Sequence, residues 1–554
     1  MAGITYATTT LLTASICYCL VTAATAYNIL VLSPITTPSH TNVLKPLVMA
    51  LADQRNHSVT YWNGLKPPSA FNSTSGNLRV LHSSPGDLVD INSDHGIRFR
   101  HRNSPFRLFF DIPQRMATYC TAVFNDPIFH RLMMLNGTAD GQQQEERYDL
   151  LVIEGVFNDC ALLLAKALDL PFVYFNCMSP TPWLLDAVGS PLALDHFPHP
   201  GFSYTDQMSL WQRAVNALSG VMIVYFHRWV VMPTVDRVAA NILGPGRNLT
   251  PVWDIEDRYL SLLMTNSHFS INYQFPMLPA VVQIGGLYCA PPKPLPQELE
   301  SFVEASGDDG FILVSFGSIV KGSQVPDGIR FLFLSTFARL SQRVIFKWED
   351  QPGENVSIPS NVKLLPWMPQ QDLLGHPKIR LFINHGGLNS KQEAVYHGVP
   401  FIALPLFADQ PINAQKAQDD GYAIRLDWDT LTEEILYDAI QRILTDPRYA
   451  LRMKEVSALS RDEMTSALDR AVYWIEYVIR HGGAPHLRSA SRQLSLHQRG
   501  FIDVMLVVVS IAFLVAYVAI CMCRRAFLLL ALAARKQQHD TPTRRMMGSA
   551  KKVD

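Results

Sequence analysis

Short apolar runs alternate along the first half of the chain with longer stretches that have the character of helices. The run NILVL at residues 28–32 and the run DLLVI at residues 149–153 are typical of buried strands. Strands that alternate with helices indicate βαβ units and a parallel sheet. We predict strands at residues 28–32, 58–62, 149–153 and 172–175, and helices at residues 41–54 and 159–168.

The second half repeats this alternation. Between the halves lies the proline-rich segment Ala290–Pro296, which can be neither helix nor central strand. We therefore predict an α/β fold with two facing Rossmann-like doubly wound domains, residues 27–289 and residues 290–500. Ligands of such sheets bind at the carboxyl ends of the strands, which predicts a cleft between the domains. The predicted elements are strands at residues 311–315, 343–347, 362–364, 380–383 and 401–404, and helices at residues 328–340 and 390–397.

The first apolar run of the chain, Leu11–Val21, is too short to span a bilayer. Ala24-Thr25-Ala26 follows with the small-x-small pattern of a signal-peptidase site. We predict a cleaved secretory signal at residues 1–26, with Tyr27 as the mature first residue. No Lys or Arg precedes Leu11, which departs from the usual signal pattern, and an uncleaved anchor is the alternative.

A second apolar run, Val504–Cys523, contains 20 uncharged residues. At ~1.5 Å per residue it can cross a ~30 Å hydrocarbon core, so we predict a transmembrane helix at residues 501–523 rather than a buried core helix. Arg524 and Arg525 follow, and positive charge marks the cytosolic side. These features predict a single-pass type I protein with residues 27–500 in the lumen and a basic cytosolic tail at residues 524–554.

The chain ends in Lys-Lys-Val-Asp, which resembles the dilysine signal that returns membrane proteins to the endoplasmic reticulum. Every N-x-S/T sequon falls in the predicted lumenal part, in agreement with that topology. The candidate glycosylation sites are Asn56, Asn72, Asn136, Asn248 and Asn355.

The amino-acid composition and charge argue against several classes of function. Hydrophobic residues make up 48% of the chain and charged residues 17%, so the chain can bury large cores. Its 47 basic and 48 acidic residues leave a net charge of −1, and the dense basic segment is confined to residues 524–554, which argues against a nucleic-acid partner. The 8 cysteines are too sparse for a disulfide scaffold and form no CxxC pair outside the apolar runs, so a zinc or redox motif is not expected.

Residues of the types that form ligand-binding sites are most concentrated at residues 367–410. The predicted strand at residues 380–383 turns through Gly386 and Gly387 into a helix, whose free N–H groups and partial positive charge suit a phosphate. Neither GxGxxG nor GxxxxGK[ST] occurs, so dinucleotide and P-loop sites are not indicated.

This segment resembles the signature of the UDP-glycosyltransferases, the family that includes the UDP-glucuronosyltransferases. Residues 157–160 (FNDC) and 342–349 (QRVIFKWE) resemble invertebrate members in particular. The resemblance implies the two-domain GT-B type of fold and a UDP-sugar co-substrate, with no further cofactor and no metal. The matching pieces are Trp367-x-Pro369-Gln370, His376-Pro377, His385-Gly386-Gly387-x-Asn389-Ser390, Glu393, Gly398-Val399-Pro400, Asp409-Gln410-x-x-Asn413-Ala414, Phe316-Gly317-Ser318 and Ser39-His40.

The resemblance also implies a role for each residue of the donor site. Trp367 would stack on uracil and Gln370 would bond its edge, while Glu393 would accept from both ribose hydroxyls. Asp409 and Gln410 would bond the transferred sugar. The remaining residues would hold the diphosphate or the sugar next to it: His385, Gly387, Asn389, Ser390 and Ser318.

Structural alternatives exist for these positions. The alternative role for Trp367 is that of a core tryptophan beside a turn proline. Glu393 is also the last residue of a capping box, Ser390-x-x-Glu393, and Asp409 also suits a helix N-cap. For His385 the alternative is a polar residue that flanks a helix.

On the acceptor side, the resemblance implies that His40 is the general base, a role that suits an imidazole with an ordinary pKa near ~6.5. The alternative is an exposed histidine at a helix start. Its carboxylate partner would be Glu154, where many relatives have Asp, so Asp159 remains a second candidate. Asn384 stands where relatives commonly have Thr.

Asp427-Trp428-Asp429 has the DxD spacing of a metal–nucleotide site. Thr430-x-x-Glu433 follows with a capping-box pattern, so we interpret both aspartates as turn and cap residues.

The expected function is inverting transfer of a glucuronosyl or glucosyl group from UDP-glucuronate or UDP-glucose to a small lipophilic acceptor, as in detoxification or in hormone or pigment conjugation. One alternative is a non-catalytic nucleotide-sugar-binding membrane protein of the same fold, which only the unusual Glu154 supports. A membrane-tethered dinucleotide oxidoreductase is another, against which the missing GxGxxG argues. The donor sugar, the acceptor and homo-oligomer formation stay open.

Overall fold

The computed structural model describes residues 26–65, 71, 73–83, 105–135, 147–244, 249–317, 325–349 and 357–539. Nearly all of the predicted signal segment and the Lys-Lys-Val-Asp tail lie outside these ranges, as do Ser318 and the sequons Asn72, Asn136, Asn248 and Asn355. The chain forms two compact units, one through Arg492 and one from Gln493 onward.

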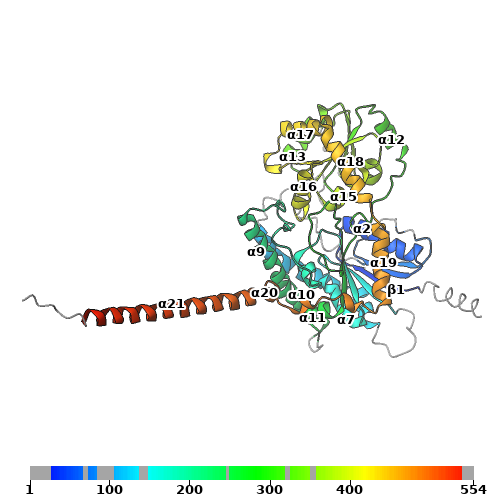
Figure 1. Cartoon of the computed structure of the whole chain (residues 1–554). Coiled ribbons are helices and arrows are strands. Elements are labelled where there is room, and N and C mark those ends of the chain that lie inside the picture. The colour runs from blue at the N-terminus through cyan, green and yellow to red at the C-terminus, as the bar shows by residue number, and fades with distance from the viewer. Residues whose placement is uncertain are drawn as a thin grey trace, which may run out of the picture. The chain divides into compact units, whose positions relative to one another are not determined.

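The first unit contains two parallel sheets (Figure 1). The first sheet has the strand order β3-β2-β1-β4-β5-β6-β7, so the order reverses between β1 and β4. The four strands predicted in this half are confirmed, and three strands near the two sheet edges are additional. The bounds are β1 (Asn28–Ser33), β2 (Ser58–Asn63), β3 (Leu78–His82), β4 (Leu150–Glu154), β5 (Phe172–Asn176), β6 (Leu260–Thr265) and β7 (Val281–Gln283).

Helices cover both faces of this sheet. Successive side chains of a strand point to opposite faces, so Leu30 and Leu32 enter one apolar core while Ile29 and Val31 enter the other. Burial on both faces explains why these strands are continuous apolar runs. The helices are α2 (Pro38–Met49, followed by one π-helical turn over Ala50–Gln54), α5 (Pro105–Phe124), α6 (Pro127–Met134), α7 (Leu162–Leu168), α8 (Pro182–Ala187), α9 (Leu210–Phe226), α10 (Met232–Leu243) and α11 (Val252–Tyr259).

The second sheet has the order β10-β9-β8-β11-β12-β13, with its reversal between β8 and β11. All five predicted strands are confirmed. The strands are β8 (Phe311–Ser315), β9 (Arg343–Lys347), β10 (Val362–Leu365), β11 (Ile379–Asn384), β12 (Phe401–Ala403) and β13 (Ala423–Arg425). The helices are α12 (Gln297–Glu304), α13 (Asp327–Ala338), α14 (Gln370–Leu374), α15 (Leu388–His397), α16 (Gln410–Asp419), α17 (Glu433–Thr445) and α18 (Pro447–Arg461).

One helix crosses back to the first sheet. Helix α19 (Ala467–Arg480) lies within the range predicted for the second domain, but its apolar residues, Ile475 among them, pack in the same core as Ile29 of β1. The guanidinium of Arg55 donates to the Glu476 carboxylate over 2.7 and 2.8 Å, which fixes α19 beside the end of the π-helical turn. Helix α19 therefore belongs to the second half of the chain by sequence but packs with the first sheet in space.

Two of the eight cysteines form a disulfide, Cys120–Cys160, which joins α5 to the short turn that precedes α7. Disulfides persist in oxidising compartments. Cys177 and Cys289 are free thiols.

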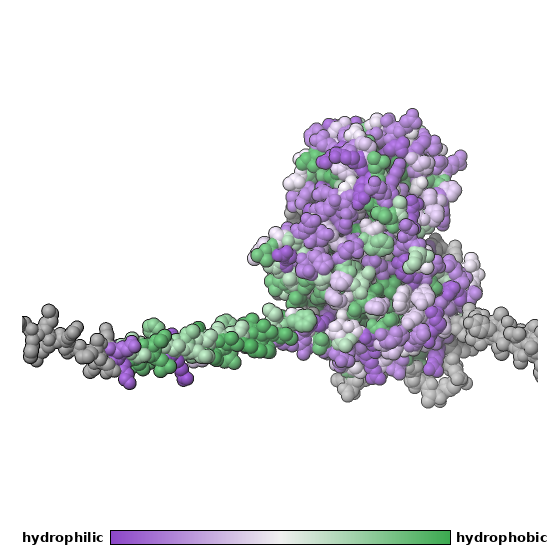
Figure 2. All heavy atoms as spheres, in the orientation of Figure 1, coloured by the Kyte–Doolittle hydropathy of each residue, from purple (hydrophilic) through white to green (hydrophobic). Residues whose placement is uncertain are grey.

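Two helical stretches of the described chain are long and apolar enough to cross a membrane, Leu210–Leu243 and Ile502–Gln537. The first is partly buried, because Met232 and Val235 of α10 enter the core of the first sheet, although Trp211 of α9 is exposed. The second belongs to α21 (Ile502–His539), which follows the short α20 (Leu496–Arg499). It is not buried at all, and Figure 2 shows its hydrophobic surface.

Candidate active site

A cavity of about 500 Å³ lies between the carboxyl ends of the two sheets. Both strand-order reversals open into it, since His40 follows β1 and His385 follows β11. Residues predicted at sites scattered between positions 40 and 410 meet here. The lining includes His40, Trp367, Gln370, His385, Gly387, Asn389, Ser390, Glu393, Asp409 and Gln410.

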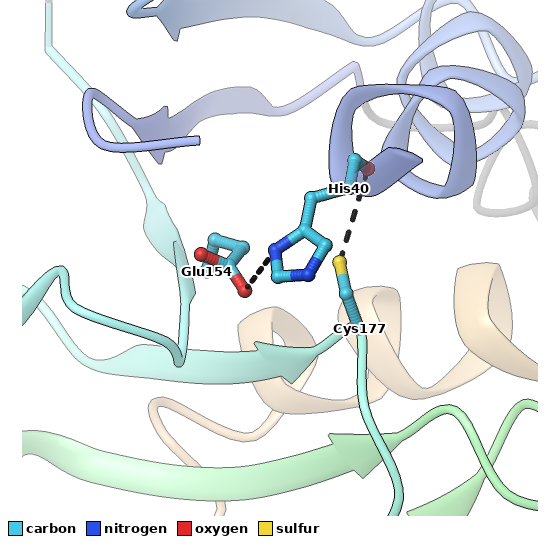
Figure 3. Close-up of side chains that lie close together, drawn as sticks. All are labelled: His40, Glu154 and Cys177. Carbon is cyan, nitrogen blue, oxygen red and sulfur yellow. Dashed lines mark hydrogen bonds and ion pairs between the residues drawn. The ribbon is translucent and has the colours of Figure 1, made fainter. Parts of the chain in front are cut away.

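On the acceptor side, His40 lies in the first turn of α2, where the Thr37 side chain caps the helix by accepting from the His40 amide. The Nδ1 atom of His40 lies 3.2 Å from Oε1 of Glu154, the last residue of β4 (Figure 3). Glu154 is fully buried behind the histidine. The pair therefore has the arrangement of an imidazole whose far nitrogen, Nε2, remains available to a substrate.

Sequence reasoning missed Asn158, which holds Glu154 in place. Its amide donates 2.8 Å to Oε2 of Glu154 and 2.9 Å to the carbonyl of Ile35, while its oxygen accepts from the Ile35 amide. One side chain thus ties the β1–α2 loop to the β4 carboxylate. Its place in FNDC, four residues after Glu154, was the available signal.

Charge and burial act in opposite directions on this pair. Burial alone lowers the pKa of His40, but the Glu154 carboxylate and, more weakly, Asp409 raise it above the ordinary value of 6.5. Burial raises the pKa of Glu154, and the neighbouring imidazole opposes that rise. The carboxylate thus favours the imidazolium that forms when His40 takes up a proton.

Asp159, the second candidate partner, points elsewhere. Its Oδ1 lies 3.0 Å from Nε2 of His227, in the turn between α9 and α10. The structure therefore places Glu154, and not Asp159, beside His40.

On the donor side, His385 is held between two glycines. A Cβ atom on Gly387 would lie 2.4 Å from Nε2 of His385, and one on Gly317 would lie 2.8 Å from its Cε1. Burial, helped by the positive charge of Lys347, lowers the pKa of His385 to about 4, so the ring is neutral at physiological pH. A neutral ring can still donate one N–H to an anion.

Helix α15 begins at Leu388, with Gly387 as an N-cap that offers no side-chain hydrogen bond. Ser390 therefore lies inside the first turn, and the capping-box interpretation of Ser390 and Glu393 is wrong. The N–H groups of this first turn stay open to a ligand, as an anion site at a helix start requires.

The part of the cavity lining around Trp367 carries one flat exposed ring. Trp367 is 65% exposed, so the alternative of a core tryptophan is wrong. The ammonium of Lys347, which sequence reasoning also missed, lies 5.6 Å from the ring centre. Lys347 is the lysine of QRVIFKWE, the segment that resembles invertebrate members and contains the predicted strand at residues 343–347.

Gln370 and Glu393 contact one another. The Gln370 amide donates to Oε2 of Glu393 and, over 3.2 Å, to the Ser390 hydroxyl. Burial raises the pKa of Glu393 to about 7. A buried carboxyl with a single side-chain donor has acceptor capacity left for hydroxyl groups.

Asp409 and Gln410 lie at the start of α16. Asp409 occupies the N-cap position, but its carboxylate accepts from the Asn413 side chain, 3.1 Å away, instead of capping the backbone. Gln410 accepts from the amides of Leu406 and Phe407 and so shapes the loop before it.

Side chains bridge the two halves of the site. The Asn389 amide donates to the carbonyl of Ser39, 3.3 Å away, and its oxygen accepts from Asn266, 3.0 Å away. The Tyr288 hydroxyl donates to the Asn389 carbonyl. These contacts hold the start of α15 against the start of α2.

The DxD segment lies away from this lining. Asp427 accepts from the Asp429 amide over 3.2 Å and closes a turn, which confirms the turn interpretation. The helix start is two residues later than predicted, because Thr432 rather than Thr430 is the N-cap of α17.

Comparison with known proteins gives a consistent result. A family model described as UDP-glucoronosyl and UDP-glucosyl transferase matches residues 105–537. UDP-glycosyltransferase UGT5 of Dactylopius coccus is 32% identical over 505 residues, which cover 90% of this chain and 92% of that protein. Human UDP-glucuronosyltransferase 2B7 is 35% identical over 402 residues (72% and 74%), and human 2-hydroxyacylsphingosine 1-beta-galactosyltransferase is 33% identical over 491 residues (87% and 85%).

Solved structures match at lower identity. Os79 from O. sativa, in complex with U2F and trichothecene, superposes with a TM-score of 0.54 at 14% identity, over 81% of this chain and 100% of that one. CalG4, the calicheamicin glycosyltransferase, superposes with a TM-score of 0.52 at 19% identity, over 82% and 99%. This likeness shows the shared GT-B fold of two parallel α/β sheets.

Proposed function

The chain belongs to the UDP-glucuronosyl and UDP-glucosyl transferase family, and we propose that it moves a glucosyl or glucuronosyl group from UDP to a hydroxyl of a small lipophilic acceptor, with inversion at the anomeric carbon. Family membership implies a UDP-sugar donor. The identity of the hexose and the acceptor are parts of the proposal.

The observation that carries the proposal is the position of the His40–Glu154 pair across a single cavity from the donor-side residues. In the proposed reaction, Nε2 of His40 takes the proton of the acceptor hydroxyl as its oxygen bonds to the anomeric carbon. The bond from that carbon to the UDP oxygen breaks on the opposite face. Glu154 stabilises the imidazolium that results.

The donor side is built to receive the departing diphosphate. The free N–H groups at the start of α15 and the neutral ring of His385 would donate to its oxygens, in a site whose geometry is set before the reaction. Trp367 would stack on uracil, and Gln370 and Glu393 would exchange their mutual contact for contacts with the nucleoside. Asp409 and Gln410 would bond the sugar hydroxyls.

We further propose that α21 anchors the protein in the endoplasmic reticulum membrane, with the catalytic part in the lumen. The apolar surface of α21, the disulfide and the family relatives support this location. A site tethered at a membrane meets apolar compounds that partition there, which is the reason to expect lipophilic acceptors and a role in detoxification or conjugation.

The test is UDP release by the purified full-length protein with phenols and steroids as acceptors. UDP-glucose and UDP-glucuronate are supplied together with one phenol to compare how well each donates its sugar. UDP-galactose is tested as a third donor. His40→Ala should lower kcat by about 10²–10⁴-fold, as removal of a general base does. His130→Ala, an exposed histidine on α6, should leave kcat unchanged.

Two outcomes would contradict the proposal. Equal UDP release by wild type and His40→Ala would show that His40 is not the general base. Binding of UDP without release from any donor would favour the non-catalytic nucleotide-sugar-binding protein instead.

A further inference from the structure

His40, Glu154 and Cys177 have side chains of the types that can bind a metal ion, and they lie close together next to the cavity. A ring nitrogen of His40, a carboxylate oxygen of Glu154 and Sγ of Cys177 all lie within 4.8 Å of one another, and Figure 3 shows the His40 ring between the Glu154 carboxylate and the Cys177 thiol. Cys177 follows β5, and its thiol is free and 3% exposed. Its S–H points to the His40 carbonyl, 3.8 Å away.

The carboxylate of this group has one oxygen directed at the other two residues. Oε2 of Glu154 accepts from Asn158, whereas the fully buried Oε1 lies 3.2 Å from Nδ1 of His40. A cation bound at this place would take Oε1 as a ligand in exchange for its contact with the imidazole.

Distances and ligand types both suit zinc. Zinc binds histidine nitrogen, carboxylate oxygen and thiolate sulfur at about 2.0–2.3 Å, so ligand atoms on one tetrahedral ion lie about 3.3–3.6 Å apart. The Nδ1–Oε1 distance of 3.2 Å is already close to this, and Sγ of Cys177 lies within 4.8 Å of a ring nitrogen of His40 and a carboxylate oxygen of Glu154. His40 and Cys177 both line the cavity, so an ion can reach these two ligands from it.

The second grouping of this kind in the described chain does not share these features. Glu300, Glu304 and His376 lie near the surface, and the ammonium of Lys378 already contacts the Glu304 carboxylate over 2.7 Å.

We propose that His40, Glu154 and Cys177 form an inhibitory site for zinc or a similar thiophilic divalent cation. The ion takes the lone pair on Nδ1, so the ring proton resides on Nε2, and His40 can no longer accept a proton from a hydroxyl. The Cys177 thiol loses its proton to solvent as the Zn–S bond forms. The inhibition, but not the binding, rests on the proposed function of His40.

The binding test uses the full-length protein and does not need turnover. Cadmium is titrated into wild type, Cys177→Ala and Cys289→Ala, and the ultraviolet charge-transfer band of cadmium thiolate is recorded. Cys289 is a free thiol outside the cavity lining, so Cys289→Ala is the matched control. We expect the band in wild type and Cys289→Ala and its loss in Cys177→Ala. No wild-type band, or an unchanged band in Cys177→Ala, would overturn the site.

The activity test measures UDP release as zinc is added. Wild type and Cys289→Ala should be inhibited and should recover with a chelator. Relative to its own metal-free activity, Cys177→Ala should need roughly tenfold or more zinc for the same fractional inhibition, because it has lost a ligand. Inhibition of Cys177→Ala at the wild-type zinc concentration would overturn the proposal. If that variant does not fold, Cys177→Ser replaces it in both tests. An enzyme that binds cadmium through Cys177 but shows no activity with any donor would contradict only the proposed function.

Discussion

Glu154 reaches His40 because Asn158 determines the direction of its carboxylate. The side chain of Glu is one methylene longer than that of Asp, so its carboxylate oxygens can take up more positions. Asn158 removes that freedom by bonding Oε2 and anchoring itself to both backbone atoms of Ile35. Oε1 is thereby left to face the imidazole. The same geometry leaves Oε1 open to the cation proposed above.

The pH dependence of the reaction follows from this pair. His40 acts as a base only when neutral, and Glu154 raises its pKa, so kcat/KM should rise with pH through that raised pKa. In Glu154→Gln the effect of burial, which lowers the pKa of His40, is opposed only by the weaker influence of Asp409. We predict that the acidic limb moves to lower pH while the plateau falls about 10²-fold or more, because the amide favours the wrong tautomer.

The control for this pH profile is Asp159→Asn, which alters the carboxylate that contacts His227. Its acidic limb should coincide with that of wild type. A shift of the limb in Asp159→Asn, or none in Glu154→Gln, would mean that another group governs the profile.

At the scale of elements, the start of α15 leaves little space beside His385 in the proposed donor site. Gly387 is the N-cap with φ −61°, a value that alanine can adopt, so its backbone does not require glycine. The constraint is instead the His385 ring, 2.4 Å from where a Cβ would stand. Glycine at this position lets the imidazole and the helix N-terminus face the same point.

Gly387→Ala should therefore displace His385 and raise the KM for the UDP-sugar or lower kcat by roughly tenfold or more, since small misplacements are costly in a preorganised site. Gly328→Ala is the matched control, because a methyl group on that glycine of α13 would meet no other atom within 4 Å. The control should keep activity and change the free energy of unfolding by no more than about 1 kcal/mol. Wild-type kinetics in Gly387→Ala would show that the ring can move without loss.

At the scale of the whole molecule, the site depends on contacts between the two sheets. Asn389 bonds Ser39 and Asn266, and α19 returns to the first sheet, where Glu476 holds Arg55. The cavity is therefore bounded by parts of one compact unit rather than by two independent domains.

The proposed lumenal orientation of this unit is tested at Asn56. This residue is exposed and has φ 57°, a conformation that Asn adopts more readily than Gln, so substitution of Asn56 itself would strain the backbone. Ser58→Ala removes the sequon without that strain, and Ser58→Thr preserves it. In cells, we expect Ser58→Ala to migrate faster by one glycan and Ser58→Thr to match wild type.

Removal of all N-glycans should abolish the difference between Ser58→Ala and wild type. If glycosidase treatment leaves the migration of wild type unchanged, residues 27–500 do not face the lumen, and the proposed topology fails.

The sequence by itself determined the strands, the repeat of the α/β unit and the donor motif. These are local properties: an apolar run such as residues 311–315 indicates a buried strand whatever its neighbours are, and the motif at residues 367–410 is a fixed spacing of residue types. The strand prediction missed β7 and β13, where three residues carry too little pattern, and it also missed the longer strands β3 and β6.

Only the tertiary structure decided which groups meet. Glu154 and Asp159 lie five positions apart, yet the turn after β4 directs one to His40 and the other to His227. His40 follows β1 and Cys177 follows β5, and only β4 lies between these strands in the sheet. Cys177 therefore lies close to His40, although the two residues are 137 positions apart in the chain. Distances between residues so far apart depend on strand order and packing, which no local pattern encodes.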